Sequence, residues 1–211
     1  MNITLRVDAT PSAPALLLRP WGEADIGPLV EAFRDPALRR GANGPMESAE
    51  DLRAWLELQG RGWVTGERLA FAVLEDHPGS REGRLAGSVV IKRGISGQGP
   101  AEAGYWTAAH ARGRGVAPRA LEAVTRWTFE TFAADGLESI NLLHQVDNPA
   151  SCRVAEKARY EFRQILPAQP PSFPRPGHLH VRRAGSRPDP GCEAPGVRRL
   201  RGAWGATVPA S

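Results

Sequence analysis

The stretch that decides the fold is residues 101–132, AEAGYWTAAHARGRGVAPRALEAVTRWTFETF. Its first part, Glu102–Thr107, carries aromatic and small residues and predicts a short buried strand. A basic, glycine-containing loop runs from Arg112 to Ala117, and Pro118 stands where the first turn of a helix is expected. Apolar residues then recur at steps of three and four, as on one face of a helix: Val116, Ala120, Val124, Trp127 and Thr131.

This loop has the properties of an anion site. Gly113 and Gly115 allow the main chain to bend sharply and a ligand to approach it closely. The helix that follows points free N–H groups and the positive end of its dipole at one spot, where a pyrophosphate fits in size and charge. The spacing is neither GxxxxGK[ST] nor GxGxxG, which argues against a Walker-type ATP site and a dinucleotide fingerprint.

The length and composition predict one globular domain with flexible ends. The chain has 211 residues, of which 41% are hydrophobic. We expect a flexible leader over residues 1–13, a folded domain over 14–183, and a disordered tail rich in Gly, Pro and Arg over 184–211.

Charge and cysteine content exclude several classes of protein. Arginine supplies 25 of the 27 basic residues and the net charge is +4, but basic and aromatic residues are not interleaved, so specific nucleic-acid binding is not favoured. The sequence has no long apolar run for a membrane span and no signal-peptide core. With only Cys152 and Cys192, a disulfide framework or zinc site is not expected, and a reducing cytoplasm fits.

Periodicity and turn signals outline the elements. We expect helices over 23–34, from Ser48 until glycines 60, 62 and 66 break it, over 115–133, and from Asn148 to Ala158. We expect strands over 16–21, 69–74, 85–92, 102–107, 139–144, 162–166 and 177–182, with connections over 36–45 and 167–176. The fold class is α/β (α+β): an antiparallel meander, a right-handed parallel crossover through the 115–133 helix, and helices on both faces of a mixed sheet.

Two motifs resemble one known family. The form Arg112-x-x-Gly115-x-Ala117 is similar to the acetyl-CoA loop of the GCN5-related N-acetyltransferase (GNAT) family. The segment Asn148-Pro149-Ala150-Ser151 resembles the Asn-x-x-Ser motif of that family's RimJ/RimL-like branch. The resemblance spans about residues 15–183 and implies the GNAT fold, with acetyl-CoA as co-substrate and no metal.

The resemblance also assigns cofactor contacts. The strand before the loop and the next parallel strand would splay apart, with the pantetheine arm in the wedge flanked by Trp106 and Thr107. Main-chain N–H groups of the loop would bind the pyrophosphate, and Arg112 and Arg114 are candidate charge partners. The cofactor-binding set is therefore Trp106, Thr107, Arg112, Gly113, Arg114, Gly115, Val116, Ala117, Asn148 and Ser151.

The same resemblance makes Ser151 the proton donor to the departing CoA thiolate, although a first-turn serine also commonly bonds the backbone. Asn148 would contact the pantetheine arm, cap its helix, or do both. Cys152, near a helix N-terminus, could be a nucleophile. Direct attack of an amine within a ternary complex is the family's habit.

The general base is not fixed by the sequence. Some relatives place a glutamate where this chain has Leu143. Glu102 is the first candidate and His144 the second. His178 and His180 share one face of the last strand, where they could line the acceptor pocket, hydrogen-bond, or argue weakly for metal, since two histidines lack a third ligand. A chain of waters without a dedicated base is the remaining alternative.

The sequence departs from the family at Arg159, where a left-handed glycine usually ends the second helix. Either the helix ends differently or the arginine is strained.

The sequence therefore predicts an acetyl-CoA-dependent N-acetyltransferase that acts on a primary amine, either a protein N-terminus or a small molecule. The acceptor pocket would be built from the second helix, the 36–47 connection and the 167–178 loop. A homodimer is compatible with this interpretation. The rivals are a non-catalytic acyl-CoA-binding sensor on the same fold and a nucleic-acid-associated protein.

Overall fold

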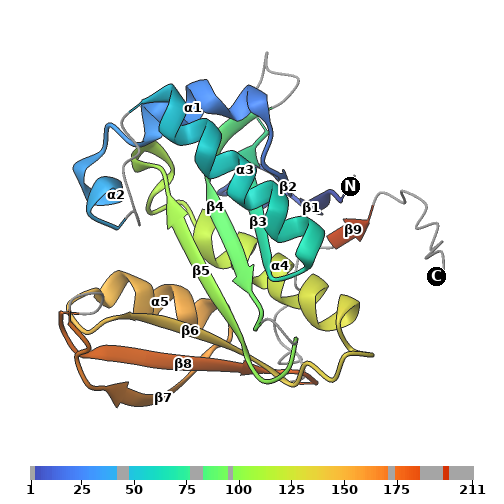
Figure 1. The fold of residues 1–211 in the computed structure, drawn as a ribbon, viewed down its shortest axis with the longest axis vertical. Coiled ribbons are helices and arrows are strands. Elements are labelled where there is room, and N and C mark those ends of the chain that lie inside the picture. Colours follow the sequence, from blue (N-terminus) through green and yellow to red (C-terminus); the bar gives the residue numbers. More distant parts are fainter. Residues whose placement is uncertain are drawn as a thin grey trace.

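A single mixed sheet organises the chain (Figure 1). The computed structural model describes residues 3–41, 48–76, 83–94, 97–170, 174–185 and 197–199. The strands are β1 (Leu5–Val7), β2 (Leu16–Pro20), β3 (Arg68–Glu75), β4 (Arg84–Lys92), β5 (Ala101–Thr107), β6 (Ser139–Gln145), β7 (Glu161–Leu166), β8 (Gly177–Arg183) and β9 (Val197–Arg199). Their order is β7-β8-β6-β5-β4-β3-β2-β1-β9, and every neighbouring pair is antiparallel except β5 and β6.

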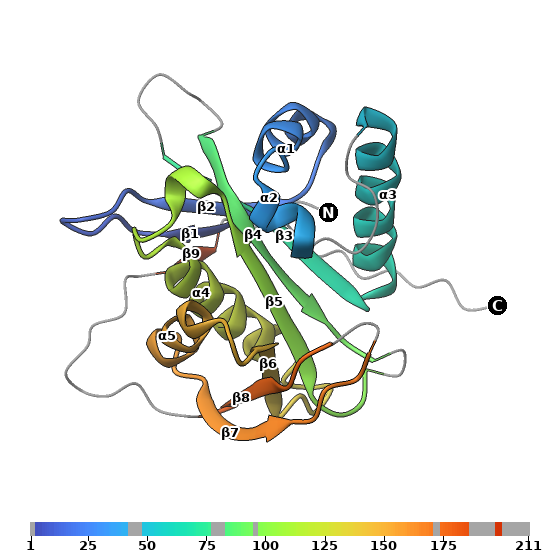
Figure 2. The ribbon, with the colours of Figure 1, turned by 90° about the vertical axis from the view of Figure 1, so that its left-hand side faces the viewer.

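Helices cover both faces of the sheet (Figure 2). The helices are α1 (Ile26–Ala32), α2 (Pro36–Gly41), α3 (Ala49–Thr65), α4 (Val116–Thr131) and α5 (Pro149–Lys157), with short 3-10 turns η1 (Glu23–Asp25) and η2 (Ala109–Ala111). Helices α1 to α3 lie on one face, and α4 and α5 lie on the other. The α4 helix carries the crossover between β5 and β6, so the predicted fold class and the parallel pair are confirmed.

Two apolar layers hold these helices to the sheet. Leu29 of α1 and Leu52 of α3 are fully buried in one layer. In the other, Leu121 and Val124 of α4 are fully buried. The predicted helical face is the buried face, which explains why the 3.6-residue period was readable from the sequence.

Helix α3 is longer than predicted, because Gly60 and Gly62 do not break it and Gly62 is a close packing position. It runs through Gly60 and Gly62 and ends where Gly66 adopts a left-handed φ of 74°. A Cβ on Gly62 would meet the Cβ and the carbonyl oxygen of Arg68 at 2.6 Å. The predicted start is confirmed, since Ser48 and Asp51 exchange the two bonds of a capping box.

The ends and one connection also differ from expectation. Residues 1–13 were expected as a flexible leader, yet Leu5 and Val7 are buried in β1, which pairs with both β2 and β9. Within the expected disordered tail, Val197–Arg199 forms β9, and residues 186–196 and 200–211 lie outside the described residues. Strands of three residues are too short for a periodic signal. The 36–45 connection contains α2, and residues 42–47 likewise lie outside the described residues.

Helix α5 ends in a strained position. Arg159 has a φ of 61° and is the only non-glycine with positive φ among the described residues. The Arg159 N–H donates to the Glu156 carbonyl, and the Tyr160 N–H donates to the Ala155 carbonyl, which is the Schellman pattern of helix termination. The helix therefore ends as it would with glycine, and the arginine bears the strain.

We predict that Arg159→Gly stabilises the protein by about 1 kcal/mol, because glycine adopts this conformation without a Cβ clash. The melting temperature should rise by about 2–4 °C for a chain of this size. Arg159→Ala serves as the control: it removes the same side chain but keeps the clash, so its melting temperature should stay near that of the wild type. An equal gain in both variants would assign the effect to the side chain instead.

Candidate active site

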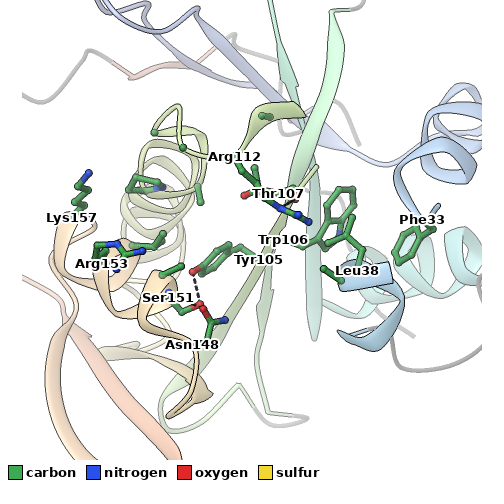
Figure 3. A pocket seen from close by; sticks show the side chains of 18 residues that line it. Phe33, Leu38, Tyr105, Trp106, Thr107, Arg112, Asn148, Ser151, Arg153 and Lys157 are labelled. Carbon is green, nitrogen blue, oxygen red and sulfur yellow. Dashed lines mark hydrogen bonds between the residues drawn. The ribbon is translucent and has the colours of Figure 1, made fainter. Parts of the chain in front are cut away.

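A cavity of about 670 Å³ opens between the end of β5 and the start of α5 (Figure 3). The loop before α4 forms one wall, and α2 closes the side opposite α5. The lining residues are Phe33, Ala37, Leu38, Tyr105, Trp106, Thr107, Ala111, Arg112, Gly113, Gly115, Ala117, Pro118, Asn148, Ala150, Ser151, Arg153, Val154 and Lys157. Eight of the ten predicted cofactor contacts are among them.

The cavity exists because β5 and β6 separate. The two strands pair only at Ala101, Glu102 and Ala103, whereas β5 continues to pair with β4 as far as Thr107. From residue 104 onward one edge of β5 therefore has no strand beside it. Its main-chain groups are available to a ligand, which is the wedge that the sequence resemblance implied.

Alternate side chains of β5 serve the two sides of this wedge. The Tyr105 ring points toward α5 (Figure 3). Trp106 points the other way, where it stacks on Trp21 with ring centroids 6.1 Å apart and meets the edge of Phe33 at 5.8 Å. The cavity thus has a polar side near α5 and an apolar side near α1 and α2.

The loop before α4 leaves its main chain open to the cavity. Gly113 and Gly115 have left-handed φ values of 74° and 75°. A Cβ on Gly113 would meet nothing within 4 Å, so no side chain fills this bend. The first N–H groups of α4 have no intrahelical partner, and Pro118, as the third helical residue, loses no bond there. The predicted anion site is sterically free.

Two predicted contacts do not reach the cavity through their side chains. Arg114 Nη1 lies 3.1 Å from a carboxylate oxygen of buried Glu75. Val116 is packed into the core with 2% of its surface exposed. Both residues retain main-chain N–H groups beside the bend, but Arg114 is held by Glu75 rather than presented to an anion.

The cationic groups in the cavity come from three other positions. Arg112 lines the cavity while its guanidinium bonds Asp35 and the Thr107 carbonyl. Arg153 and Lys157 are one turn apart on α5 and both line the cavity (Figure 3). The sequence analysis missed these two α5 residues, although their spacing of four on a predicted helix places them on one face. Together the three cations suit a ligand with several phosphate groups.

The polar side is built around Ser151. The Tyr105 hydroxyl donates a hydrogen bond of 2.9 Å to Ser151 Oγ, which leaves the serine hydroxyl proton for another acceptor. Asn148 Oδ1 accepts a bond from the Ser151 N–H at 3.2 Å, so the predicted N-cap is confirmed. The pKa of the Tyr105 hydroxyl is raised, mainly by burial, although the hydrogen bond to Ser151 acts in the opposite direction. Tyr105 therefore stays protonated at neutral pH, and sequence reasoning had missed it.

Neither predicted base lines the cavity. Glu102 lies on the paired part of β5, and its carboxylate is 2.6 Å from Lys92 Nζ. His144 lies on the face of β6 that α5 covers, among His178, His180 and Cys152. The cavity lining, within the described residues, contains no carboxylate and no imidazole. Glu102 and His144 therefore do not line this cavity, and a catalytic role for either stays a prediction.

The histidine cluster is a second polar site. His144 Nε2 lies 3.2 Å from His180 Nε2, and Cys152 Sγ lies 3.5 Å from His144 Nε2 and 3.2 Å from His178 Nδ1. The sequence analysis set aside a metal for want of a third ligand, but the fold supplies two more residues beside His178 and His180. None of the four lines the cavity described above.

Comparisons with known proteins agree with this geometry. The sequence model described as "Acetyltransferase (GNAT) domain" matches residues 15–161. None of the curated proteins is a significant sequence match. No helix within the described residues is long and apolar enough to cross a membrane.

Solved structures resemble the fold at low sequence identity. Mycobacterium smegmatis RimJ in complex with CoA-disulfide is 18% identical, with a TM-score of 0.69 and coverage of 90% of each chain. RimL, a ribosomal L7/L12 α-N-protein acetyltransferase with coenzyme A, is 16% identical, with a TM-score of 0.66 over 84% of this chain and 97% of its own. The microcin C7 self-immunity acetyltransferase MccE, with acetyl-CoA and AMP, is 14% identical, with a TM-score of 0.65 over 82% and 97%.

We predict that Gly113→Glu abolishes the rise in melting temperature that acetyl-CoA causes in the wild type, because it places a carboxylate against the pyrophosphate site. Gly136→Glu is the matched control, since Gly136 has a φ of 75° and also has nothing within 4 Å of a Cβ, but does not line the cavity. Both variants should lose about 1 kcal/mol from the left-handed conformation. Only Gly136→Glu should keep the rise in melting temperature that acetyl-CoA causes. If Gly113→Glu also kept it, this loop would not be the pyrophosphate-binding site.

Proposed function

Because the chain belongs to the acetyltransferase (GNAT) family and is an acetyl-CoA-dependent N-acetyltransferase, we propose that it acetylates the N-terminal amine of a polypeptide. The observation that supports acetyl transfer at this site is the wedge between β5 and β6, with an open anion site at one end and the Tyr105–Ser151 pair beside it. A small-molecule amine is the second candidate acceptor.

The donor is held by main chain and by cations. The pyrophosphate binds at the bend before α4, where free N–H groups and the helix dipole converge. Arg153 and Lys157 neutralise phosphate charge from the α5 side. The pantetheine arm lies along the edge of β5 that β6 leaves unpaired, so that the thioester reaches the region of Tyr105 and Trp106.

Acetyl transfer then proceeds by direct attack. The amine nitrogen forms a bond to the thioester carbonyl carbon, and a main-chain N–H near the end of β5 stabilises the oxyanion. As the C–S bond breaks, the Ser151 hydroxyl gives its proton to the CoA thiolate and receives one from the Tyr105 hydroxyl, which regains a proton from water. The amine proton passes to water, because no carboxylate or imidazole is among the described residues that line the cavity.

The acceptor enters from the apolar side. Phe33, Leu38 and Trp106 form that wall (Figure 3), which suits a chain that follows the reacting amine rather than a highly charged molecule. Two of the structural neighbours, RimJ and RimL, bear names of this branch, and the RimL name specifies the α-amine of ribosomal protein L7/L12. These likenesses support a protein N-terminus as the acceptor. No observation favours the non-catalytic sensor.

An acceptor screen tests the proposed substrate class. Short peptides with free N-termini and a panel of small amines are supplied with acetyl-CoA, and free CoA release is followed. We expect peptides to react and their Nα-acetylated forms to be inert, because acetylation removes the nucleophilic amine. Reaction confined to small amines would contradict a peptide acceptor and support a small-molecule amine instead. Binding of acetyl-CoA without release of free CoA would support the non-catalytic sensor.

We predict that Ser151→Ala lowers kcat by about 100-fold, which is the lower end of what general acid catalysis supplies. Tyr105→Phe should lower kcat by a smaller factor, because Ser151 keeps its own hydroxyl. In both variants acetyl-CoA should still raise the melting temperature nearly as much as in the wild type.

The matched control for Tyr105 is the chain's other tyrosine. The Tyr160 hydroxyl is buried and lies 2.6 Å from Thr125 Oγ1, away from the cavity. Tyr160→Phe loses this bond, so it should lower the melting temperature and leave kcat unchanged. A fall in kcat of equal size in Tyr105→Phe and Tyr160→Phe would remove Tyr105 from the proton path.

A further inference from the structure

Three elements bring four metal-binding side chains together behind α5. His144 is on β6, His178 and His180 are on β8, and Cys152 is on the second turn of α5. His144 is directly opposite His178 in the antiparallel pair, and His180 is opposite Leu142. The three imidazoles therefore share the face of the sheet on which α5 lies (Figure 1).

The spacing of their donor atoms matches a small tetrahedral ion. One ligand atom from each residue lies within 4.8 Å of all the others. The two Nε2 atoms of His144 and His180 are 3.2 Å apart, and Cys152 Sγ is 3.5 Å from His144 Nε2. In a tetrahedral zinc site with ordinary bond lengths, N···N and N···S edges are about 3.3 and 3.6 Å. The side chains surround a position from which Zn²⁺ would reach them with little movement.

The surroundings of His144 favour the tautomer that can bind a metal ion through Nε2. His144 Nδ1 lies 2.9 Å from the Gln145 carbonyl, which fixes the proton on Nδ1 and leaves the Nε2 lone pair facing the cluster. The Phe162 ring packs against His178 and His180, with ring centroids 5.3 and 5.6 Å apart.

We propose that His144, Cys152, His178 and His180 bind one Zn²⁺ ion that fastens the start of α5 to strands β6 and β8. Three nitrogens and one thiolate fill the four positions of a structural zinc site, so no position remains for a substrate. Acetyl transfer itself needs no metal, and the ion does not touch the cavity. Its role is to position α5, since Cys152 is the residue next to Ser151 and lies one helical turn after the N-cap Asn148.

Zinc content and cobalt spectroscopy test this site without reference to activity. The full chain is made without a polyhistidine tag and in a Cys192→Ser background, so that Cys152 is the only thiol. We expect about one zinc per chain by elemental analysis and a higher melting temperature with zinc than with a chelator. Cobalt in place of zinc should give the strong visible bands of a tetrahedral site and a thiolate-to-cobalt charge-transfer band.

Variants assign the ligands. Cys152→Ser should lose the charge-transfer band, and Cys152→Ser and His178→Ala should each bind zinc at least about 100-fold more weakly. His110→Ala is the matched control, because this histidine lies on η2 outside the cluster and should leave zinc affinity unchanged. Far-UV circular dichroism and a cooperative melting transition verify that each variant is folded.

Two results would overturn the proposal. One is a wild-type chain that takes up no zinc or cobalt at micromolar concentration. The other is a Cys152→Ser variant with the wild-type cobalt spectrum. Loss of metal binding in His110→Ala as well would show that the effect is not specific to the cluster.

Discussion

The separation of β5 from β6 after Ala103 is the constraint on which the rest of the molecule depends. A buried N–H or carbonyl without a partner costs about 1–3 kcal/mol, so the free edge of β5 needs water or a ligand beside it. Pairing with β4 continues to Thr107 and keeps that edge rigid. The fold therefore leaves one main-chain edge of β5 without a partner strand, and a linear amide-containing cofactor arm can pair with such an edge along its length.

The two helices that border this edge have different tasks. α4 is fixed by its apolar face, and its N-terminus offers main-chain N–H groups that need no side-chain chemistry. α5 contributes side chains instead: in the proposed mechanism Ser151 supplies the proton, and Arg153 and Lys157 neutralise phosphate charge. Because α5 is only nine residues long, its position depends on what holds it from behind. The bond between Tyr105 and Ser151 is the direct link across the wedge.

Local rules explain why much of the fold and half of the site were readable from the sequence. The bend at Gly113 and Gly115 and the cap at Asn148 depend on neighbouring residues only, and each is found where predicted. The left-handed conformation of Arg159 is one of the two alternatives that the sequence left open. Side-chain partners far apart in sequence were not readable. Glu102 forms an ion pair with Lys92, and Arg114 forms one with Glu75, and neither pairing could be predicted from the sequence. Tyr105 was missed because alternation places neighbouring strand residues on opposite faces, and the sequence does not say which face matters.

The aromatic stack at the apolar side has an optical consequence. Trp106 lines the cavity and lies against Trp21, which in turn meets the edge of Trp55 at 5.3 Å. Indole emission responds to the polarity and the motion of its surroundings, and energy migrates readily among rings this close. A molecule seated beside Trp106 therefore alters the fluorescence of all three rings. Binding in the cavity therefore changes the tryptophan fluorescence of the native chain, so it can be followed without a dye or label.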